Sequence, residues 1–583
     1  MQDHHTISIY NASAGAGKTF ALVKNYLVIL FKSKNEFKYR RILAITFTNK
    51  AVAEMKLRIV DNLQSFTKDE ILNDPSPMLL AIEEETGLSR LDIQNKSKKL
   101  LKNIVQDFAS FDVVTIDNFT HRVIRTFAHD LKIPQNFEVE LNTQDVLEQA
   151  VDRLIDKAGK DKLVTDILLD YALEKIDSDR SWDISRDFYD ISRLLLSEND
   201  RAYLKMLEGK SLEDFAELKR HIRQSVISTE KAIIENAKKL LDFISSNGLE
   251  EGHFKGKYLP KALVKIADGL FTINTTSAWV VNLGEEPMYT KTQKQPIKDI
   301  LDQIAPEIAL QFNSIKHDIL NLSFQEELYK KITPLSVLQA IQNEVDKIKT
   351  ENNLILISDF NELISKNIAD QPTPFIYERL GERYENYFID EFQDTSRLQW
   401  GNLIPLIDNA VSVNQSEDLS SLMLVGDPKQ AIYRWRGGEA AQFIELSNTT
   451  NPFQNEDKAI INLPFNYRSF HEVINFNNSF FSKLANIFEN EDYKRIYTEG
   501  NAQQVNSKEG GYVSISFIDA INKEESVPLY LDEVVSRIAS CRENGFDLNE
   551  LCILVRKNSE GIAIAQRLQE ENIPVISNES LLI

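Results

Sequence analysis

The glycine-rich stretch Asn11–Phe20, NASAGAGKTF, constrains the fold of this chain more than any other feature. Thr6–Tyr10 before it alternates in the manner of a short β-branched strand, and FALVKNYLVILFK after it has apolar residues at helical spacing. A strand, a glycine turn and a helix in this order place backbone N–H groups and a helix N-terminus around a phosphate. Lys18 would then reach the β- and γ-phosphates of a nucleotide, and the Thr19 hydroxyl would bind magnesium.

One position of this stretch departs from the G-x-x-x-x-G-K-[ST] pattern, because an alanine stands where the first glycine is expected. The alternative interpretation is a chance turn of small residues. The loop by itself does not identify the reaction, since kinases, GTPases and motors all use such a loop. The residues that would form the cradle before the lysine are Ala12, Ser13, Ala14, Gly15, Ala16 and Gly17.

Composition limits the class of protein. A chain of 583 residues should hold three or more domains. Its two cysteines, Cys541 and Cys552, give neither a disulfide framework nor a cysteine metal cluster, and we expect a cytoplasmic protein. Its apolar runs are shorter than the roughly 20 residues that span a bilayer, so no membrane partner is expected. A net charge of −21 argues against a broad basic surface but allows a local basic channel.

Further strands end in polar turns. Arg41–Ile59 is an apolar strand, a Thr/Asn turn and an amphipathic helix, and Phe111–Phe127 repeats that plan. Tyr384–Trp400 places two adjacent carboxylates, Asp390 and Glu391, at the end of another strand. Nucleotide hydrolysis needs one carboxylate for magnesium and one that orients or deprotonates the attacking water. The pair therefore predicts the catalytic end of a nucleotide site.

Two later segments complete this series. Ser421–Glu439 is a strand that ends in a polar turn with Gln430 and then an aromatic and basic cluster. Ile461–Ser469 brings Tyr467 and Arg468.

The motifs ASAGAGKT, TFTNKAVAEM, IDEFQDTS, VGDPKQAIYRWRG and NYRS stand in the order of those of the UvrD/Rep group of superfamily 1 helicases. The chain resembles this family over about Thr6–Thr126 and Asp359–Ile583, and RecB- and AddA-like helicase–nuclease subunits most closely. The resemblance implies an ATP- and Mg²⁺-dependent helicase that moves 3′ to 5′ on DNA in repair or recombination. The implied partners are single-stranded and duplex DNA and a second helicase–nuclease subunit. Two positions depart from the family, namely Gln2 as the sole upstream glutamine and Asp117 in place of a histidine.

The resemblance also assigns roles by position. Lys18 and Thr19 would hold phosphate and magnesium, Asp390 the magnesium, and Glu391 the hydrolytic water. Gln430 would sense the γ-phosphate and link it to DNA. Arg468 would contact the γ-phosphate, and Tyr467 would stack on adenine.

DNA contacts are implied for Phe47, Thr48, Asn49 and Trp435. An aromatic ring is a suitable platform for unpaired bases, because stacking contributes about 1–3 kcal/mol per base and ignores sequence. Core packing is the alternative for Phe47 and Trp435, although Trp435 stands between two arginines.

We expect an α/β fold, in which a RecA-like P-loop motor domain carries a large α-helical insertion and is followed by part of a second RecA-like domain. The first motor domain is predicted at residues 1–134 and 354–451, the helical arm at 135–353 and the partial second domain at 452–583. GYVSISFID and ELCILVRK are predicted as strands of the last domain. Basic runs at Lys96–Lys102 and Leu218–Ser225 are either phosphate contacts or solvated helix faces.

Motifs that the family places later are not found before Ile583, so we expect an N-terminal part of a longer polypeptide. The second γ-phosphate arginine is among these motifs, and arginine fingers contribute about 10³–10⁵ in rate. Residues 1–583 should then bind nucleotide but hydrolyse it very slowly, and should not unwind duplex DNA. Two alternatives to a helicase are another P-loop enzyme such as a kinase, for which no acceptor-site feature is present, and a DNA- or partner-binding scaffold with a degenerate motor.

Overall fold

The chain forms two compact units. One consists of Met1–Tyr467 with Ile487–Ala502, and the other of Arg468–Asn486 with Gln503–Ile583. The computed structural model describes residues 5–126, 128, 137–140, 142–177, 181–198, 200–207, 209–369, 383–412, 420–434, 437–448, 450–498 and 502–577. No helix among these residues has both the length and the apolar character needed to cross a membrane.

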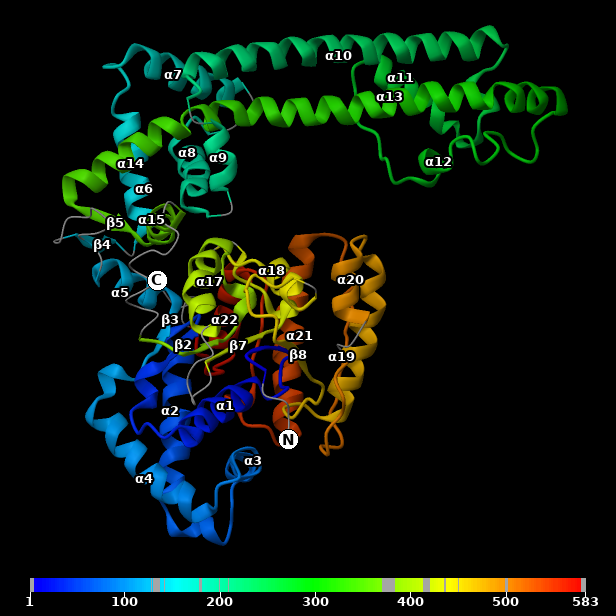
Figure 1. Ribbon diagram of the computed structural model, residues 1–583. Coiled ribbons are helices and arrows are strands. Elements are labelled where there is room, and N and C mark those ends of the chain that lie inside the picture. Colours follow the sequence, from blue (N-terminus) through cyan, green and yellow to red (C-terminus); the bar gives the residue numbers. More distant parts are fainter. Residues whose placement is uncertain are drawn as a thin grey trace. The chain divides into compact units, whose positions relative to one another are not determined.

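A six-stranded parallel sheet lies at the centre of the first unit (Figure 1). Its strand order is β3-β2-β6-β7-β1-β8, so neighbouring strands come from distant parts of the sequence. In the register, Ile9 lies opposite Leu424 on one side and Ile460 on the other. The predicted α/β class with a parallel sheet is confirmed. The strands are β1 (Ile7–Ala12), β2 (Ile42–Thr46), β3 (Val113–Thr115), β6 (Asn386–Ile389), β7 (Ser421–Gly426) and β8 (Lys458–Leu463).

Helices cover both faces of this sheet because its strands are apolar on both sides. In β2, Ile42 and Ala44 face one apolar cluster while Leu43 and Ile45 face another, as the two-residue period of a strand requires. The first cluster is completed by α1 (Lys18–Lys32), α2 (Asn49–Phe66), α3 (Pro77–Thr86) and α4 (Arg90–Gln106). The second is completed by α5 (Ile116–Thr126), α15 (Ile357–Ala369), α17 (Arg397–Ser412) and α18 (Ala440–Leu446).

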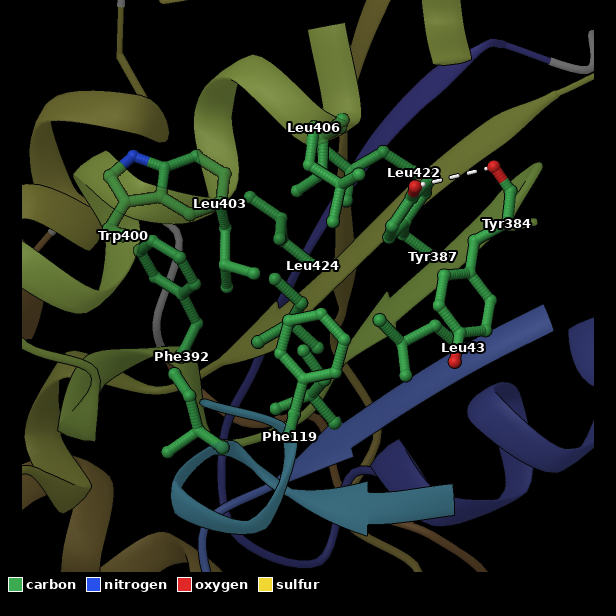
Figure 2. Close-up of a cluster of buried hydrophobic side chains, with 14 of the residues drawn as sticks. Leu43, Phe119, Tyr384, Tyr387, Phe392, Trp400, Leu403, Leu406, Leu422 and Leu424 are labelled. Atoms are coloured by element: carbon green, nitrogen blue, oxygen red, sulfur yellow. Dashed lines mark hydrogen bonds between the residues drawn. The ribbon is translucent and has the colours of Figure 1, made fainter. Parts of the chain in front are cut away.

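Figure 2 shows part of the second cluster, where aromatic rings from several elements meet. The rings of Phe392 and Trp400 pack edge to face, with centroids 4.8 Å apart. The Tyr387 hydroxyl donates to the Tyr384 carbonyl oxygen at 3.3 Å. Burial of each such ring contributes about 1.5–3 kcal/mol to the stability of the fold. Because Phe392 and Trp400 follow β6, their burial holds the segment after β6 against the sheet.

A helical arm is inserted between β4 (Glu138–Glu140) and β5 (Leu354–Leu356), which pair in parallel. Its two long helices have 35 and 42 residues and lie side by side (Figure 1). Ser211 and Asp214 form a capping box at the start of the 35-residue helix. The arm comprises α6 (Thr143–Ile155), α7 (Lys162–Asp177), α8 (Ser185–Ser192), α9 (Arg201–Leu207), α10 (Leu212–Ser246), α11 (Tyr258–Ala267), α12 (Ala278–Val281), α13 (Gln295–Ser336) and α14 (Leu338–Asn352).

The boundary of the second unit differs from the predicted one. A start at residue 452 would precede β8, which pairs with β1 and so belongs to the first sheet. The compact units divide after Tyr467, and α20 (Glu491–Thr498) returns to the first unit. The sequence around residue 452 does not reveal this, because strand pairing with β1 is a contact across more than 400 residues.

The second unit contains α19 (His471–Leu484), α21 (Lys523–Glu543) and α22 (Asn558–Glu570). The two predicted strands, 511–519 and 550–557, are wrong for this structure, since no strand forms among residues 503–577 that it describes. Tyr512, Phe517 and Leu554 in these stretches are strongly exposed. An alternating apolar pattern makes a strand only where a neighbouring segment supplies backbone hydrogen bonds.

Candidate functional site

The glycine-rich loop joins the buried end of β1 to the first turn of α1. Gly15 and Gly17 have φ of 80° and 86°, a left-handed conformation that favours glycine. The Ala16 N–H donates to the Ser13 carbonyl at 3.1 Å and closes the turn. Ala12, the departure from the glycine pattern, is the last residue of β1 and is fully buried, so a methyl group is accommodated there. The loop therefore has the strand–turn–helix setting that phosphate binding requires.

Lys18 and Glu391 meet across the carboxyl ends of the strands. The Lys18 ammonium donates to Glu391 Oε2 at 3.0 Å and to Oε1 at 3.2 Å. Glu391 follows β6 with a φ of 51°, an uncommon backbone conformation for a non-glycine residue. Residues 373 positions apart are thus brought together where the predicted phosphate loop and carboxylate pair were expected to act.

Asp390 is held by the sheet itself. Its N–H donates to the Ile45 carbonyl at 2.9 Å, and its Oδ1 accepts from the Glu391 N–H at 3.0 Å. Burial, followed by the nearby Glu391 charge, raises the pKa of Asp390 to about 7, although Lys18 opposes the change. A carboxyl with this pKa is destabilised as an anion until a cation approaches it.

The two predicted magnesium ligands have the chemistry that this ion requires. The Thr19 hydroxyl and the Asp390 carboxylate are the hard oxygen ligands that Mg²⁺ prefers. The raised pKa of Asp390 also suits a bound divalent cation, because the cation would favour the ionised form of the carboxyl.

Gln430 lies in a short turn after β7 that contacts both the phosphate loop and the carboxylate pair. Its Nε2 donates to Asp427 Oδ2 at 2.7 Å. The Asp427 N–H donates to Gln393 Oε1 at 2.9 Å, and Gln393 Nε2 donates to Glu391 Oε2 at 2.8 Å. The Lys429 ammonium donates to Ser13 Oγ at 2.6 Å, and burial lowers its pKa. The structure thus joins the predicted Gln430 to the carboxylate pair.

Three residues of this network were missed from the sequence, namely Gln393, Asp427 and Lys429. They stand inside the DEFQD and GDPKQ stretches, next to the predicted site residues. Their polar character within a buried segment was the available signal, since a buried polar side chain needs a partner.

Tyr467 lies beside the phosphate loop. Its N–H donates to the Gly15 carbonyl at 2.9 Å, while its side chain is 61% exposed. An exposed ring at this position is free to stack on a flat base. Arg468 belongs to the second unit, where its carbonyl accepts from Lys508 Nζ at 3.4 Å, and its contact with the γ-phosphate stays a prediction.

The residues predicted to contact DNA follow β2. Phe47 is half-buried, and its ring centroid lies 4.5 Å from that of Tyr433 rather than within either core cluster of the sheet. Thr48 is exposed and caps α2, with Oγ1 accepting from the Ala51 N–H at 3.1 Å. Asn49 begins that helix and is also exposed. Trp435 lies outside the described residues.

Two further groups of polar residues have structural partners. In the run Lys96–Lys102, the Lys96 ammonium donates to the Phe31 carbonyl at 2.7 Å. In the run Leu218–Ser225, Lys219 donates to Glu174 and Thr333, each at 2.7 Å. Asp117 Oδ1 accepts from Gln399 Nε2 at 3.4 Å. Gln2 lies outside the described residues.

Several known proteins are similar to this chain. The chain is 24% identical to the exonuclease/helicase subunit RexA of Lactococcus lactis subsp. cremoris (strain MG1363), over 98% of this chain and 48% of that protein. It is 25% identical to one subunit of the ATP-dependent helicase/nuclease of Clostridioides difficile (strain 630), over 82% and 37%. It is 23% identical to the RecBCD enzyme subunit RecB of Haemophilus influenzae, over 97% and 49%.

The chain thus spans about half the length of the curated relatives that it matches. The family model described as UvrD/REP helicase N-terminal domain matches residues 3–451, and the one described as UvrD-like helicase C-terminal domain matches residues 461–581. The chain therefore belongs to the UvrD/REP helicase family.

Proposed function

We propose that this protein is an ATP-dependent, Mg²⁺-dependent DNA helicase that moves 3′ to 5′ along single-stranded DNA in repair or recombination. The observation that carries the proposal is the Lys18–Glu391 pair, since it places a phosphate-binding cation against a carboxylate able to act on water. The names of the relatives, which describe helicase/nuclease subunits, support the same function. The word subunit in these names supports a second helicase–nuclease subunit as a partner, and we include duplex DNA among the proposed partners.

The chemistry begins with an exchange of partners at Lys18. In the structure the ammonium is neutralised by Glu391, and the phosphates of ATP would compete for it. Glu391, released from the ammonium, would then accept a proton from the attacking water or orient it. Magnesium bound by Thr19 and Asp390 would neutralise phosphate charge. The exposed Tyr467 ring would hold the base of the nucleotide.

On the DNA side, two aromatic rings lie close to the nucleotide machinery. Phe47 follows β2, and Tyr433 stands three positions after Gln430, so the pair of rings and Gln430 share one edge of the sheet. Base stacking on these rings would connect DNA position to the turn that carries Gln430. We assign Thr48, Asn49 and Trp435 to the same DNA path, and Arg468 to the γ-phosphate.

The test is hydrolysis and strand separation by the purified full-length protein. We expect ATP binding, hydrolysis stimulated by single-stranded DNA, and unwinding of a duplex with a 3′ tail in preference to one with a 5′ tail. Lys18→Ala is the control, and it should lose nucleotide binding. In the same assay we expect residues 1–583 alone to bind ATP, to hydrolyse it very slowly and not to unwind the duplex.

ATP binding without any stimulation by DNA would favour a scaffold with a non-hydrolysing motor. Unwinding of the 5′-tailed duplex alone would overturn the proposed direction of movement.

A further inference from the structure

A buried glutamine lies between the carboxylate pair and the turn that carries Gln430. Gln393 is only 1% exposed and stands in a short 3₁₀ helix, Phe392–Asp394, after β6. Its side-chain amide donates to Glu391 Oε2 at 2.8 Å and to Asp394 Oδ2 at 3.4 Å, and it accepts from the Asp427 N–H at 2.9 Å. Gln393 therefore bridges the carboxylate pair and the backbone of this turn.

The orientation of this amide follows from its partners. The Asp427 N–H can only donate, so the oxygen of Gln393 must face it. An ionised Glu391 carboxylate can only accept, so the Gln393 NH₂ group must face Glu391. A glutamate at this position would keep the first hydrogen bond and lose the second, and a methionine would lose both.

The surrounding backbone is built around the glutamine. A Cβ atom at Gly426, the last residue of β7, would lie 2.9 Å from Gln393 Oε1 and 3.1 Å from the Phe443 ring. A side chain at this position would require Gln393 or Phe443 to shift, so the glycine at the end of β7 leaves the room that the Gln393 amide occupies. The side chain therefore has little freedom, as positioning of a neighbour requires.

The Asp427 side chain fixes the turn that follows Gly426. The Asp427 carboxylate accepts from Gln430 Nε2 at 2.7 Å and from the Lys429 N–H at 3.1 Å. Displacement of Gln430 would thus act on Asp427, and displacement of the Asp427 backbone would act on Gln393 and Glu391. This is a continuous chain of three hydrogen bonds between side chains predicted to sense the γ-phosphate and to activate water.

We propose that Gln393 is a positioning residue for hydrolysis, which holds the Glu391 carboxylate and couples it to the turn of Gln430 through the Asp427 N–H. The inference rests on the proposed function. The effect of Gln393 on Glu391 is largest after the phosphates of ATP have displaced Glu391 from Lys18. The hydrogen bond from Gln393 then still fixes the Glu391 carboxylate. Loss of this hydrogen bond should slow hydrolysis without weakening nucleotide binding.

The experiment compares Gln393→Glu and Gln393→Met with wild type in single-turnover ATP hydrolysis by the full-length protein, with and without single-stranded DNA. We expect nucleotide affinity within about threefold of wild type and a hydrolysis rate lowered about 10–100-fold, as for loss of a hydrogen bond to a charged group.

Gln442→Glu is the matched control. Gln442 is also buried, and its side-chain amide donates to the Thr395 carbonyl rather than to Glu391 or Asp427. The control introduces the same buried charge away from Glu391, so it should lower the melting temperature while hydrolysis by the folded protein stays within about threefold of wild type. Rates of both Gln393 variants within twofold of wild type, or a deficit no larger than that of Gln442→Glu, would overturn the inference.

Three outcomes separate this inference from the proposed function. Absence of DNA-stimulated hydrolysis in wild type contradicts the function itself. Normal stimulation in wild type together with normal Gln393 variants contradicts only the positioning role. If Gln393→Glu does not fold, Gln393→Met decides, because methionine has nearly the same volume and adds no charge.

Discussion

The two ends of the central sheet carry buried charges in opposite arrangements. At the amino ends of the strands, Asp112 accepts from Arg122 at 2.6 Å, from Arg383 at 2.7 Å and from the Tyr384 hydroxyl at 2.7 Å. Glu385, just before β6, pairs with Lys38 and Arg41. At the carboxyl ends, Asp390, Glu391, Asp394 and Asp427 gather around two lysines, Lys18 and Lys429.

This difference fits a stabilising role for the charges at the amino ends and the proposed ligand site at the carboxyl ends. The aspartate at the amino ends has two cationic partners, so its burial is compensated. At the carboxyl ends, burial and then the charge of Glu391 raise the pKa of Asp390 to about 7 and that of Asp394 to about 6. An incompletely compensated acidic cluster beside a phosphate loop is suited to a bound cation and nucleotide.

The largest effect is expected from the same substitution, glutamate to glutamine, made at each end of β6. Glu391→Gln should lower ATP hydrolysis about 10²–10⁴-fold, the contribution typical of a general base, while nucleotide affinity is retained. Glu385→Gln, at the other end of β6, should lower stability and leave hydrolysis by the folded protein near that of wild type. Single-turnover hydrolysis and nucleotide titration measure both. Comparable loss of hydrolysis in the two variants would remove the distinction between the ends.

The second effect concerns stability at the amino ends. Asp112→Ala should lower the free energy of unfolding of the first unit by about 3–5 kcal/mol, because it leaves Arg122 and Arg383 without their buried partner. Chemical denaturation, followed by a probe in the first unit, measures the change. A loss below about 1 kcal/mol would mean that this charge cluster is not the stabilising counterpart of the site.

A smaller effect concerns aromatic residues that flank β2. Phe47→Ala should weaken binding of single-stranded DNA by about 1–3 kcal/mol, the contribution of one stacked base. Phe37→Ala removes an exposed ring that precedes β2 and packs against Arg40, so it should leave DNA affinity unchanged. Fluorescence titration with a labelled oligonucleotide compares the two. Equal affinities for both variants would support packing against Tyr433 as the role of Phe47.

The smallest effect is a gain in stability that depends on pH. The pKa of Asp390 is higher in the folded than in the unfolded protein, so the folded state retains a proton that the unfolded state has lost between about pH 4 and pH 7. Stability from this group therefore falls as the pH rises through that window. Asp390→Asn removes the effect and should stabilise the nucleotide-free protein by on the order of 1–2 kcal/mol at about pH 8, since part of the charge remains hydrated.

The same variant should gain less at about pH 5, where Asp390 is already protonated in the folded state. Thermal unfolding at the two pH values measures the difference. A destabilised variant, or a gain that is the same at both pH values, would show that Asp390 is compensated as Asp112 is.

Much of the fold was predictable because its signals are local. The segment around Ile42–Thr46 forms the predicted strand, polar turn and helix within about 20 residues. Around Val113–Thr115 the predicted strand and helix form, but the helix follows the strand directly without the turn. The strands predicted at 511–519 and 550–557 failed for the converse reason, since a strand depends on a partner that its own sequence does not specify.

For the candidate site, sequence alone determined the phosphate loop and the adjacent carboxylates. Backbone geometry after β1 follows from neighbouring residues, namely Gly15 and Gly17 with their positive φ. Only the tertiary structure decided that Lys18 pairs with Glu391, that Gln393 joins Glu391 to Asp427, and that β8 belongs to the first sheet. The physical reason is distance along the chain. Hydrogen bonds between residues separated by tens or hundreds of positions depend on which strands become neighbours, and that choice is made by burial of the whole apolar core.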